Sequence, residues 1–207
     1  GIDVDHFIPT DASVLRESLG IADKKVIVSV GRLVHRKGQD HLIQAMPEIL
    51  KSVPSAHLLL VGEGPYREHL QNLVKQHKLE NSVTFIGRIQ YNDLPMYICA
   101  GDIFAMPCRS RLMGLEVEGL GIVYLEASAC GLPVLAGNSG GAPDAVVQNK
   151  TGLVVDGTNN KQIATAAIEL LTNVESSQKM GIAGRQWIID NWRWEIWSKD
   201  FENLLNK

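Results

Sequence analysis

Val26-Ile27-Val28-Ser29-Val30-Gly31-Arg32 is the stretch that decides the fold. Residues 26–30 form a short and almost wholly apolar run, which is typical of a strand buried on both faces. The amphipathic segment 39–52 follows and predicts a helix, although Pro47 should kink it or make it restart. A buried strand that leads through a glycine loop into a helix is the repeating unit of a parallel sheet.

The same unit recurs toward the C-terminus. Apolar runs predict further strands over residues 57–61, 83–86, 103–106, 133–135 and 153–155. Amphipathic segments predict helices over residues 66–77, 92–99 and 122–130, and from residue 160 onward. The sequence therefore predicts an α/β fold, with a Rossmann-like parallel sheet and helices on both faces. Such sheets bind ligands at the carboxyl ends of their strands, so the loops that follow them are where chemistry is expected.

Composition excludes several classes of protein. The 207 residues are 45% hydrophobic and 21% charged, which excludes a disordered chain and a disulfide scaffold. The net charge of −3 provides no basic field for nucleic acid, so no nucleic-acid partner is expected. Three widely spaced cysteines indicate reduced thiols in a cytosolic domain. The histidines and cysteines show no metal-ligand spacing, and no metal site is predicted.

The loop after the first strand contains Gly31, Arg32, Lys37 and Gly38. The glycines permit close approach of a ligand to the backbone. Arg32, as a planar fork, and Lys37, as a point charge, can converge on a diphosphate. The alternative is a solvated basic loop, but its place at the carboxyl end of a strand favours the binding role.

The next two loops carry weaker patterns. Gly62-Glu63-Gly64 resembles the start of a dinucleotide fingerprint, but Arg67 stands where the third glycine should be. A tight turn is therefore favoured over an NAD site. The loop that contains Ile89 could present backbone groups to a nucleotide base, although on its own it favours a structural role.

The loop after residues 103–106 is long and charged, and loops of this length in compact domains are usually functional. Its end, Gly119-Leu120-Gly121-Ile122, places free N–H groups at a helix N-terminus, which can bind a phosphate or a sugar oxygen. Glu118 precedes this terminus and Glu126 lies within the helix. One carboxylate could hold a sugar and the other a ribose. In the alternative, Glu118 caps the helix and Glu126 lies on its surface. That alternative would be favoured for either glutamate alone, but the pair at this spacing favours the binding role.

Together these motifs resemble the retaining glycosyltransferase family 4, whose members have the GT-B fold. The matching motifs are residues 1–9, Val30-Gly31-Arg32 with Lys37-Gly38, the E-x7-E pattern from Glu118 to Glu126, residues 129–134, and Gly140-Gly141. The resemblance implies that residues 1–207 are the C-terminal nucleotide-sugar-binding domain, one half of a GT-B fold, with the N-terminal acceptor domain absent. Residues 1–20 would be the lead-in between domains. Residues from about 190 to 207 would either cross back onto the other domain or pack on their own sheet.

The resemblance also implies roles for the site residues. Gly31, Arg32 and Lys37 would bind the donor diphosphate. Glu118 would contact the transferred sugar, so that Arg32, Lys37 and Glu118 form the catalytic set. Backbone amides near Leu120, Gly121 and Ile122 would assist with the sugar, Glu126 would contact the ribose, and the backbone near Ile89 would read the base. Leu120 stands where many members carry Phe, and Asp144 where many carry Glu.

Within the family, residues 106–121 are similar to the actinobacterial mannosyltransferases of phosphatidylinositol mannoside synthesis. This implies a metal-independent retaining α-mannosyltransferase that uses GDP-mannose, needs no cofactor, and acts on a glycolipid acceptor held by the missing domain. The full enzyme would be cytoplasmic and peripheral at the inner face of the plasma membrane. Two alternatives stay open: a transferase that uses UDP- or ADP-glucose on a soluble sugar acceptor, and a non-catalytic nucleotide-binding module.

Overall fold

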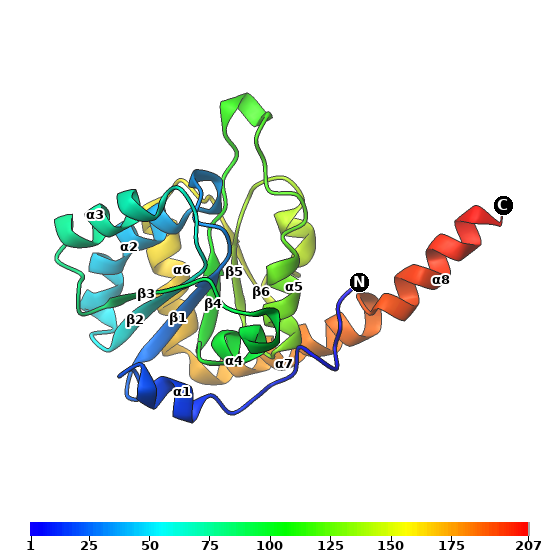
Figure 1. The fold of residues 1–207 in the computed structure, drawn as a ribbon, viewed down its shortest axis with the longest axis horizontal. Coiled ribbons are helices and arrows are strands. Elements are labelled where there is room, and N and C mark those ends of the chain that lie inside the picture. Colours follow the sequence, from blue (N-terminus) through cyan, green and yellow to red (C-terminus); the bar gives the residue numbers. More distant parts are fainter. Residues whose placement is uncertain (207) are drawn as a thin grey trace.

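Six parallel strands form the centre of the molecule (Figure 1). The computed structural model describes residues 1–206. In sheet order the strands are β3 Val83–Gly87, β2 Ala56–Val61, β1 Lys25–Val30, β4 Ile103–Met106, β5 Val134–Gly137 and β6 Gly152–Val155. Every neighbouring pair is parallel, which confirms the predicted parallel sheet.

Helices cover both faces of this sheet, as the sequence predicts (Figure 1). The helices of residues 1–206 are α1 Ser13–Ser18, α2 Gln39–Ser52, α3 Arg67–Gln76, α4 Leu94–Cys99, α5 Ile122–Ala129, α6 Asn160–Thr172, α7 Val174–Asn191 and α8 Trp194–Leu205, of which α8 does not cover the sheet. One core cluster joins the sheet to α2, α3 and α6, and the other joins it to α4, α5 and α7.

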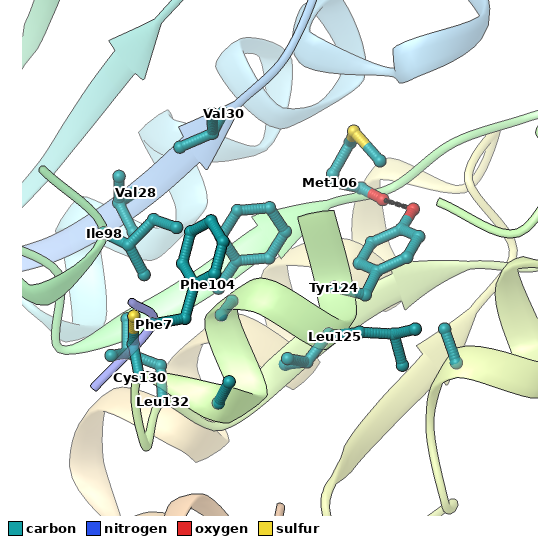
Figure 2. Packing of buried hydrophobic residues seen from close by; sticks show 14 of the residues in the cluster. Phe7, Val28, Val30, Ile98, Phe104, Met106, Tyr124, Leu125, Cys130 and Leu132 are labelled. Carbon is teal, nitrogen blue, oxygen red and sulfur yellow. Dashed lines mark hydrogen bonds between the residues drawn. The ribbon is translucent and has the colours of Figure 1, made fainter. Parts of the chain in front are cut away.

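Tyr124 anchors α5 to the sheet. Its ring packs edge-on against Phe104 of β4, with the centroids 5.9 Å apart, and its hydroxyl donates a hydrogen bond of 2.6 Å to the Met106 carbonyl (Figure 2). A buried tyrosine whose hydroxyl has a partner adds apolar area without the cost of an unpaired polar atom. The N-terminal end of α5 is thereby fixed beside the carboxyl end of β4.

The helix α2 runs without a break from Gln39 to Ser52, so the expectation that Pro47 would make it restart is wrong. Proline removes one hydrogen bond of the helix ladder, and its ring crowds the carbonyl one turn back. Met46 and Ile49 on either side of it are fully buried, and their packing holds the helix in place.

The N-terminal residues lie beside the start of α8. Ile2 is buried, pairs with Arg193 in an isolated parallel bridge, and donates a hydrogen bond of 2.6 Å to the Trp192 carbonyl. From there α8 extends away from the body (Figure 1). None of its residues belongs to either core cluster among residues 1–206. The crossing role expected for residues 190–207 stays a prediction, and position 207 lies outside the described residues.

Strand order reverses direction between β1 and β4, because the chain moves outward to β2 and β3 and then returns to the other side of β1. Two loops that leave neighbouring strands toward opposite faces open a crevice at such a switch point. The loop after β1 and the loop after β4 meet here, and these are the loops in which the sequence analysis placed the catalytic set.

Candidate active site

Lys37 and Glu118 meet at the switch point. Lys37 ends a short turn of 3-10 helix, His35–Lys37, after β1, and Glu118 lies near the end of the loop after β4. The Lys37 Nζ lies 2.9 Å from the Glu118 Oε2, and the two side chains are only 11% and 8% exposed. The contact lacks hydrogen-bond geometry, so Oε2 is a buried acceptor without a hydrogen bond. A carboxylate oxygen has more than one acceptor site, so Oε2 keeps hydrogen-bond capacity beside its contact with Lys37.

The N-terminus of α5 offers donors beside this carboxylate. The backbone N–H groups of residues 119–123 have no acceptor within residues 1–206. Gly121, the residue before the helix, has a φ of 74°, and a methyl group there would lie 2.4 Å from the Tyr124 ring. Only glycine fits this backbone against the anchoring tyrosine. The free N–H groups and the helix dipole together form a site for an anion or for sugar oxygens.

The turn after β5 is hydrogen-bonded to the backbone at Glu118 and Gly119. The Glu118 N–H donates to the Ser139 Oγ at 3.2 Å, and the Gly141 N–H donates to the Gly119 carbonyl at 2.7 Å. A methyl group at Gly140, where φ is 55°, would fall 1.8 Å from the Glu118 carbonyl oxygen. The glycine pair therefore lets the turn approach the loop closely enough to shape the pocket.

A buried ion pair, which the sequence analysis missed, ties the two loops together. Arg109, after β4, contacts both carboxylate oxygens of Asp40 at 2.6 Å, and the side chains are 5% and 7% exposed. The Arg109 N–H also donates to the Arg36 carbonyl at 2.8 Å. The signal that could have revealed the pair is position, because Asp40 and Arg109 each follow one of two neighbouring strands.

Arg36 is a second residue that sequence reasoning missed. Its guanidinium lies 3.8 Å from Glu118 and 3.6 Å from Glu116. It is the other cation beside the Glu118 carboxylate, so Glu118 faces two positive charges in a nearly dry setting. The two contacts hold the carboxylate in place.

A cleft of about 690 Å³ opens at the carboxyl ends of β1, β2 and β3. Lys37 is not part of its lining but lies next to Gly31, which is. It is lined by Val30, Gly31, Arg32, Val61, Gly62, Glu63, Arg88, Ile89, Gln90, Tyr91 and Leu94. Arg32 is exposed, and the backbone N–H and C=O of Ile89 have no partner among the described residues. The structure thus brings Gly31, Arg32 and Ile89 to one cleft. Their roles toward a ligand stay predictions.

Glu126 lies near this cleft in the second turn of α5. It is half-buried, and burial raises the pKa of its carboxyl to about 7. Tyr91, which lines the cleft, has a pKa raised first by burial and then by the charge of Glu126. Glu126 is thus partly shielded from water and is not a fully solvated residue of the helix surface. Its role toward a ribose stays a prediction.

The raised pKa gives Glu126 a testable pH dependence. If a ribose diol donates hydrogen bonds to it, binding favours the ionised form and releases a proton. Nucleoside diphosphate affinity should then rise with pH through 7, by about tenfold between pH 6 and 8 for a group of this pKa. Calorimetry at several pH values measures this slope. Glu126→Gln should retain only the slope due to the phosphate itself, and identical slopes in the two proteins would contradict the ribose role.

Two further findings concern metals and membranes. Within residues 1–206, no group of three or more His, Cys, Asp or Glu side chains is placed to hold a metal ion. Among the same residues, no helix combines the length and the apolar character needed to cross a bilayer.

Comparison with known proteins places the chain in a family. Residues 11–187 match the family described as glycosyl transferases group 1. The chain belongs to this family. The resemblance inferred from the E-x7-E pattern and the loop after β1 is thereby confirmed.

The chain is similar to two actinobacterial mannosyltransferases. The chain is 49% identical over 208 residues to the GDP-mannose-dependent alpha-(1-6)-phosphatidylinositol monomannoside mannosyltransferase of Mycolicibacterium smegmatis, with 100% of this chain and 54% of the relative covered. It is 46% identical over 209 residues to the GDP-mannose-dependent monoacylated alpha-(1-6)-phosphatidylinositol monomannoside mannosyltransferase of Corynebacterium glutamicum, with 99% of this chain and 54% of the relative covered. The chain thus spans about half the length of the curated relatives it matches.

A similar solved structure confirms the fold. The crystal structure of Anabaena Alr3699/HepE in complex with UDP matches with a TM-score of 0.88 at 25% identity, and the match covers 100% of this chain and 56% of that one. The expected Rossmann-like half of a GT-B fold is therefore confirmed. The roles of Arg32, Lys37, Glu118 and Glu126 are not tested by these comparisons and stay predictions.

Proposed function

We propose that this protein binds GDP-mannose and supplies the donor half of a retaining, metal-independent α-mannosyltransferase that acts on a phosphatidylinositol mannoside lipid. The observation that carries donor binding is the buried Glu118 Oε2 without a hydrogen bond, beside Lys37 and five free N–H groups. The names of relatives that are 46–49% identical support mannose, GDP and the lipid acceptor.

In the proposed complex the donor runs along the carboxyl edge of the sheet. The base lies in the cleft against the unpaired backbone groups of Ile89, and the ribose donates hydrogen bonds to Glu126. The diphosphate passes Gly31 and contacts Arg32 and Lys37. The sugar then reaches Glu118 and the free N–H groups near Leu120, Gly121 and Ile122, and its hydroxyls donate to the Glu118 carboxylate. The base, ribose, diphosphate and sugar of the nucleotide sugar are thus each placed beside protein groups of complementary charge or hydrogen-bonding capacity.

Catalysis in this proposal is mainly electrostatic. The bond between the mannose C1 and the diphosphate oxygen breaks, and a bond from C1 to the acceptor oxygen forms on the same face. The leaving phosphate oxygen takes the acceptor's proton. Negative charge grows on the diphosphate, where Lys37, Arg32 and the N-terminus of α5 stabilise it in a low-dielectric setting. These fixed positive groups supply the stabilisation that a metal ion would otherwise give.

The acceptor belongs to the other half of the proposed enzyme. We assign residues 1–206 to the C-terminal domain of a GT-B enzyme, with α8 as the helix that crosses to the N-terminal domain. The apolar side chains of α8 support this assignment, since Trp194, Phe201 and Leu205 are each more than half exposed. A helix with such a face needs a partner surface. We also place the whole enzyme at the inner face of the plasma membrane, where its lipid acceptor resides.

One rival has direct support. The Anabaena neighbour is in complex with UDP, which favours a uridine nucleotide such as UDP-glucose as the donor. Base preference separates the two proposals, because the phosphate and sugar contacts are the same in both.

Titration calorimetry with GDP, UDP and ADP tests the proposal. GDP should bind at least tenfold more tightly than UDP or ADP, which corresponds to about 1.4 kcal/mol or more from contacts to the base edge. Binding should persist in a chelating buffer, because Lys37, Arg32 and α5 neutralise the diphosphate. The described domain alone should bind the donor without transferring sugar. Tighter binding of UDP would favour the rival, and failure of every nucleotide to bind would indicate a module without a donor site.

A further inference from the structure

Two of the three cysteines lie together at the ends of neighbouring helices. Cys99 is the last residue of α4, and Cys130 directly follows α5. Cys130 is 3% exposed and belongs to the core cluster of Figure 2, where it lies on the side of Phe7 and Ile98. Cys99 is partly buried and packs against the same cluster. Both carry free thiols, so the fold brings together two reduced sulfur atoms from separate helices.

Contacts to the N-terminal segment place both cysteines at the same point. The Cys99 thiol donates a hydrogen bond of 3.5 Å to the Ile8 carbonyl. Pro9, the next residue, packs against the turn that follows Cys130, since a methyl group at Gly131 would lie 3.4 Å from the Pro9 ring. The two thiols contact each other at this point. A disulfide between them therefore needs only a small approach of the sulfur atoms.

Arg185 of α7 adds a positive charge beside the two thiols. Its guanidinium donates to the Phe7 carbonyl at 3.0 Å and to the carbonyl of Ala129, the residue before Cys130. A cavity of about 410 Å³ is lined by Cys130 and Arg185, together with Ile182, which is 71% exposed. A small solute can therefore reach the cysteines from this side.

The two thiols differ in acidity. Contact with the Cys130 thiol lowers the pKa of Cys99 to about 7 against the effect of burial, and the charge of Arg185 acts in the same direction as the contact. The same contact, followed by burial and the charges of Cys99 and Glu126, raises the pKa of Cys130. The thiolate is the reactive form of cysteine. At neutral pH Cys99 is therefore the attacking group, and Cys130 is the thiol that reacts second.

We propose that Cys99 and Cys130 form a site of reversible oxidation by a peroxide, which closes a disulfide between α4 and α5. The Cys99 thiolate attacks one peroxide oxygen, the O–O bond breaks, and the departing hydroxide takes up a proton to become water. The Cys130 sulfur then attacks the sulfenic acid at Cys99. The S–S bond forms as the S–O bond breaks, and the hydroxyl leaves with the Cys130 proton as a second water. Two thiols and one hydrogen peroxide thus give one disulfide and two waters, and a thiol reductant reverses the change.

The disulfide would enclose residues 99–130, the unit that contains β4, the long loop with Glu118, and α5 with Glu126. A cross-link stabilises a fold mainly by restricting the unfolded chain. The midpoint of thermal unfolding should therefore rise by about 5 °C or more on oxidation. Disulfide formation requires no nucleotide, so its test is independent of the proposed function.

Oxidation of the intact enzyme with hydrogen peroxide, followed by peptide mass spectrometry, tests this inference. The expected product is a Cys99–Cys130 cross-linked pair, two hydrogen atoms lighter than the two thiol peptides together, which dithiothreitol returns to free thiols. Cys130→Ala should form no cross-link, and the sulfenic acid at Cys99 should then be trapped by dimedone. Cys108→Ala is the matched control, because Cys108 is buried elsewhere in the core and its loss should leave the cross-link unchanged.

The unfolding midpoint gives a second readout. Peroxide should raise it for the wild type and not for Cys99→Ser, which changes the more exposed cysteine of the pair and serves also if Cys130→Ala does not fold. Peroxide-treated wild type in which Cys99 and Cys130 stay unlinked would overturn the inference, as would a cross-link from either of them to Cys108. An unchanged midpoint in the cross-linked protein would overturn the claim that the bond ties α4 to α5.

Discussion

Lys37→Ala should slow sugar transfer by about 10²-fold or more, the range seen when one preorganised electrostatic group is removed from an active site. Lys37 is 11% exposed and lies beside the buried Glu118, so little water is present to replace its charge. Because negative charge grows on the diphosphate only as the C1–O bond breaks, the loss should fall on kcat more than on KM. Initial rates of mannose transfer at varied GDP-mannose concentration measure both constants.

Two controls accompany this variant. Lys51→Ala removes a lysine that is 73% exposed on α2, and transfer should be unchanged. Lys37→Ala also leaves Glu118 with Arg36, at 3.8 Å, as its remaining cation, so thermal unfolding must show that the variant is folded. A folded Lys37→Ala enzyme that turns over at the wild-type rate would contradict the assignment.

Asp40→Asn should lower the free energy of unfolding by about 3–5 kcal/mol, the cost of leaving one partner of a buried ion pair unpaired. Arg109 would keep its charge in a site that is 5% exposed, facing a neutral amide with one acceptor oxygen in place of the two carboxylate oxygens that it now contacts at 2.6 Å. Urea unfolding measures the change. Glu175→Gln, which breaks an exposed pair with Lys179 at 2.6 Å, should cost less than about 1 kcal/mol. A similar small loss for Asp40→Asn would refute the structural role of the pair.

The Asp40–Arg109 pair should also make the free energy of unfolding depend on pH. Burial acts to raise the pKa of Asp40, but the hydrogen bonds and charge of Arg109 outweigh it and hold the pKa below its ordinary value of 3.8. A carboxyl with a depressed folded pKa contributes stability above its unfolded pKa and loses it as the pH falls through the folded value. The contribution of the pair should therefore persist down to about pH 4 and vanish below it, and Asp40→Asn should flatten this decline.

The regular elements could be predicted from local pattern. Each predicted strand corresponds to an observed one with ends shifted by no more than two residues, and α2 has the bounds that its amphipathic pattern predicts. Apolar runs separated by Gly and Pro carry this information within short windows. The restart at Pro47 was wrongly predicted, because the burial of Met46 and Ile49, which holds α2 together there, comes from tertiary packing.

The candidate site was predictable in its loops but not in its internal contacts. Lys37 and Glu118 could be proposed because both follow strands whose carboxyl ends meet. Their direct pairing could not, nor could the bond between Asp40 and Arg109, which lie 69 positions apart in sequence. The raised pKa of Glu126 depends on burial by residues from other elements. Such properties belong to the assembled fold and leave no local pattern in the chain.

A crystal structure of the protein with GDP-mannose is the most direct test of the central claim, that Lys37, Glu118 and the N-terminus of α5 form the donor site. The diphosphate should lie within hydrogen-bond distance of the Lys37 Nζ. A mannose hydroxyl should donate to the Glu118 Oε2, which has no hydrogen bond in the free protein. A nucleotide bound with its diphosphate away from Lys37, and with the Lys37–Glu118 contact unchanged at 2.9 Å, would contradict the account.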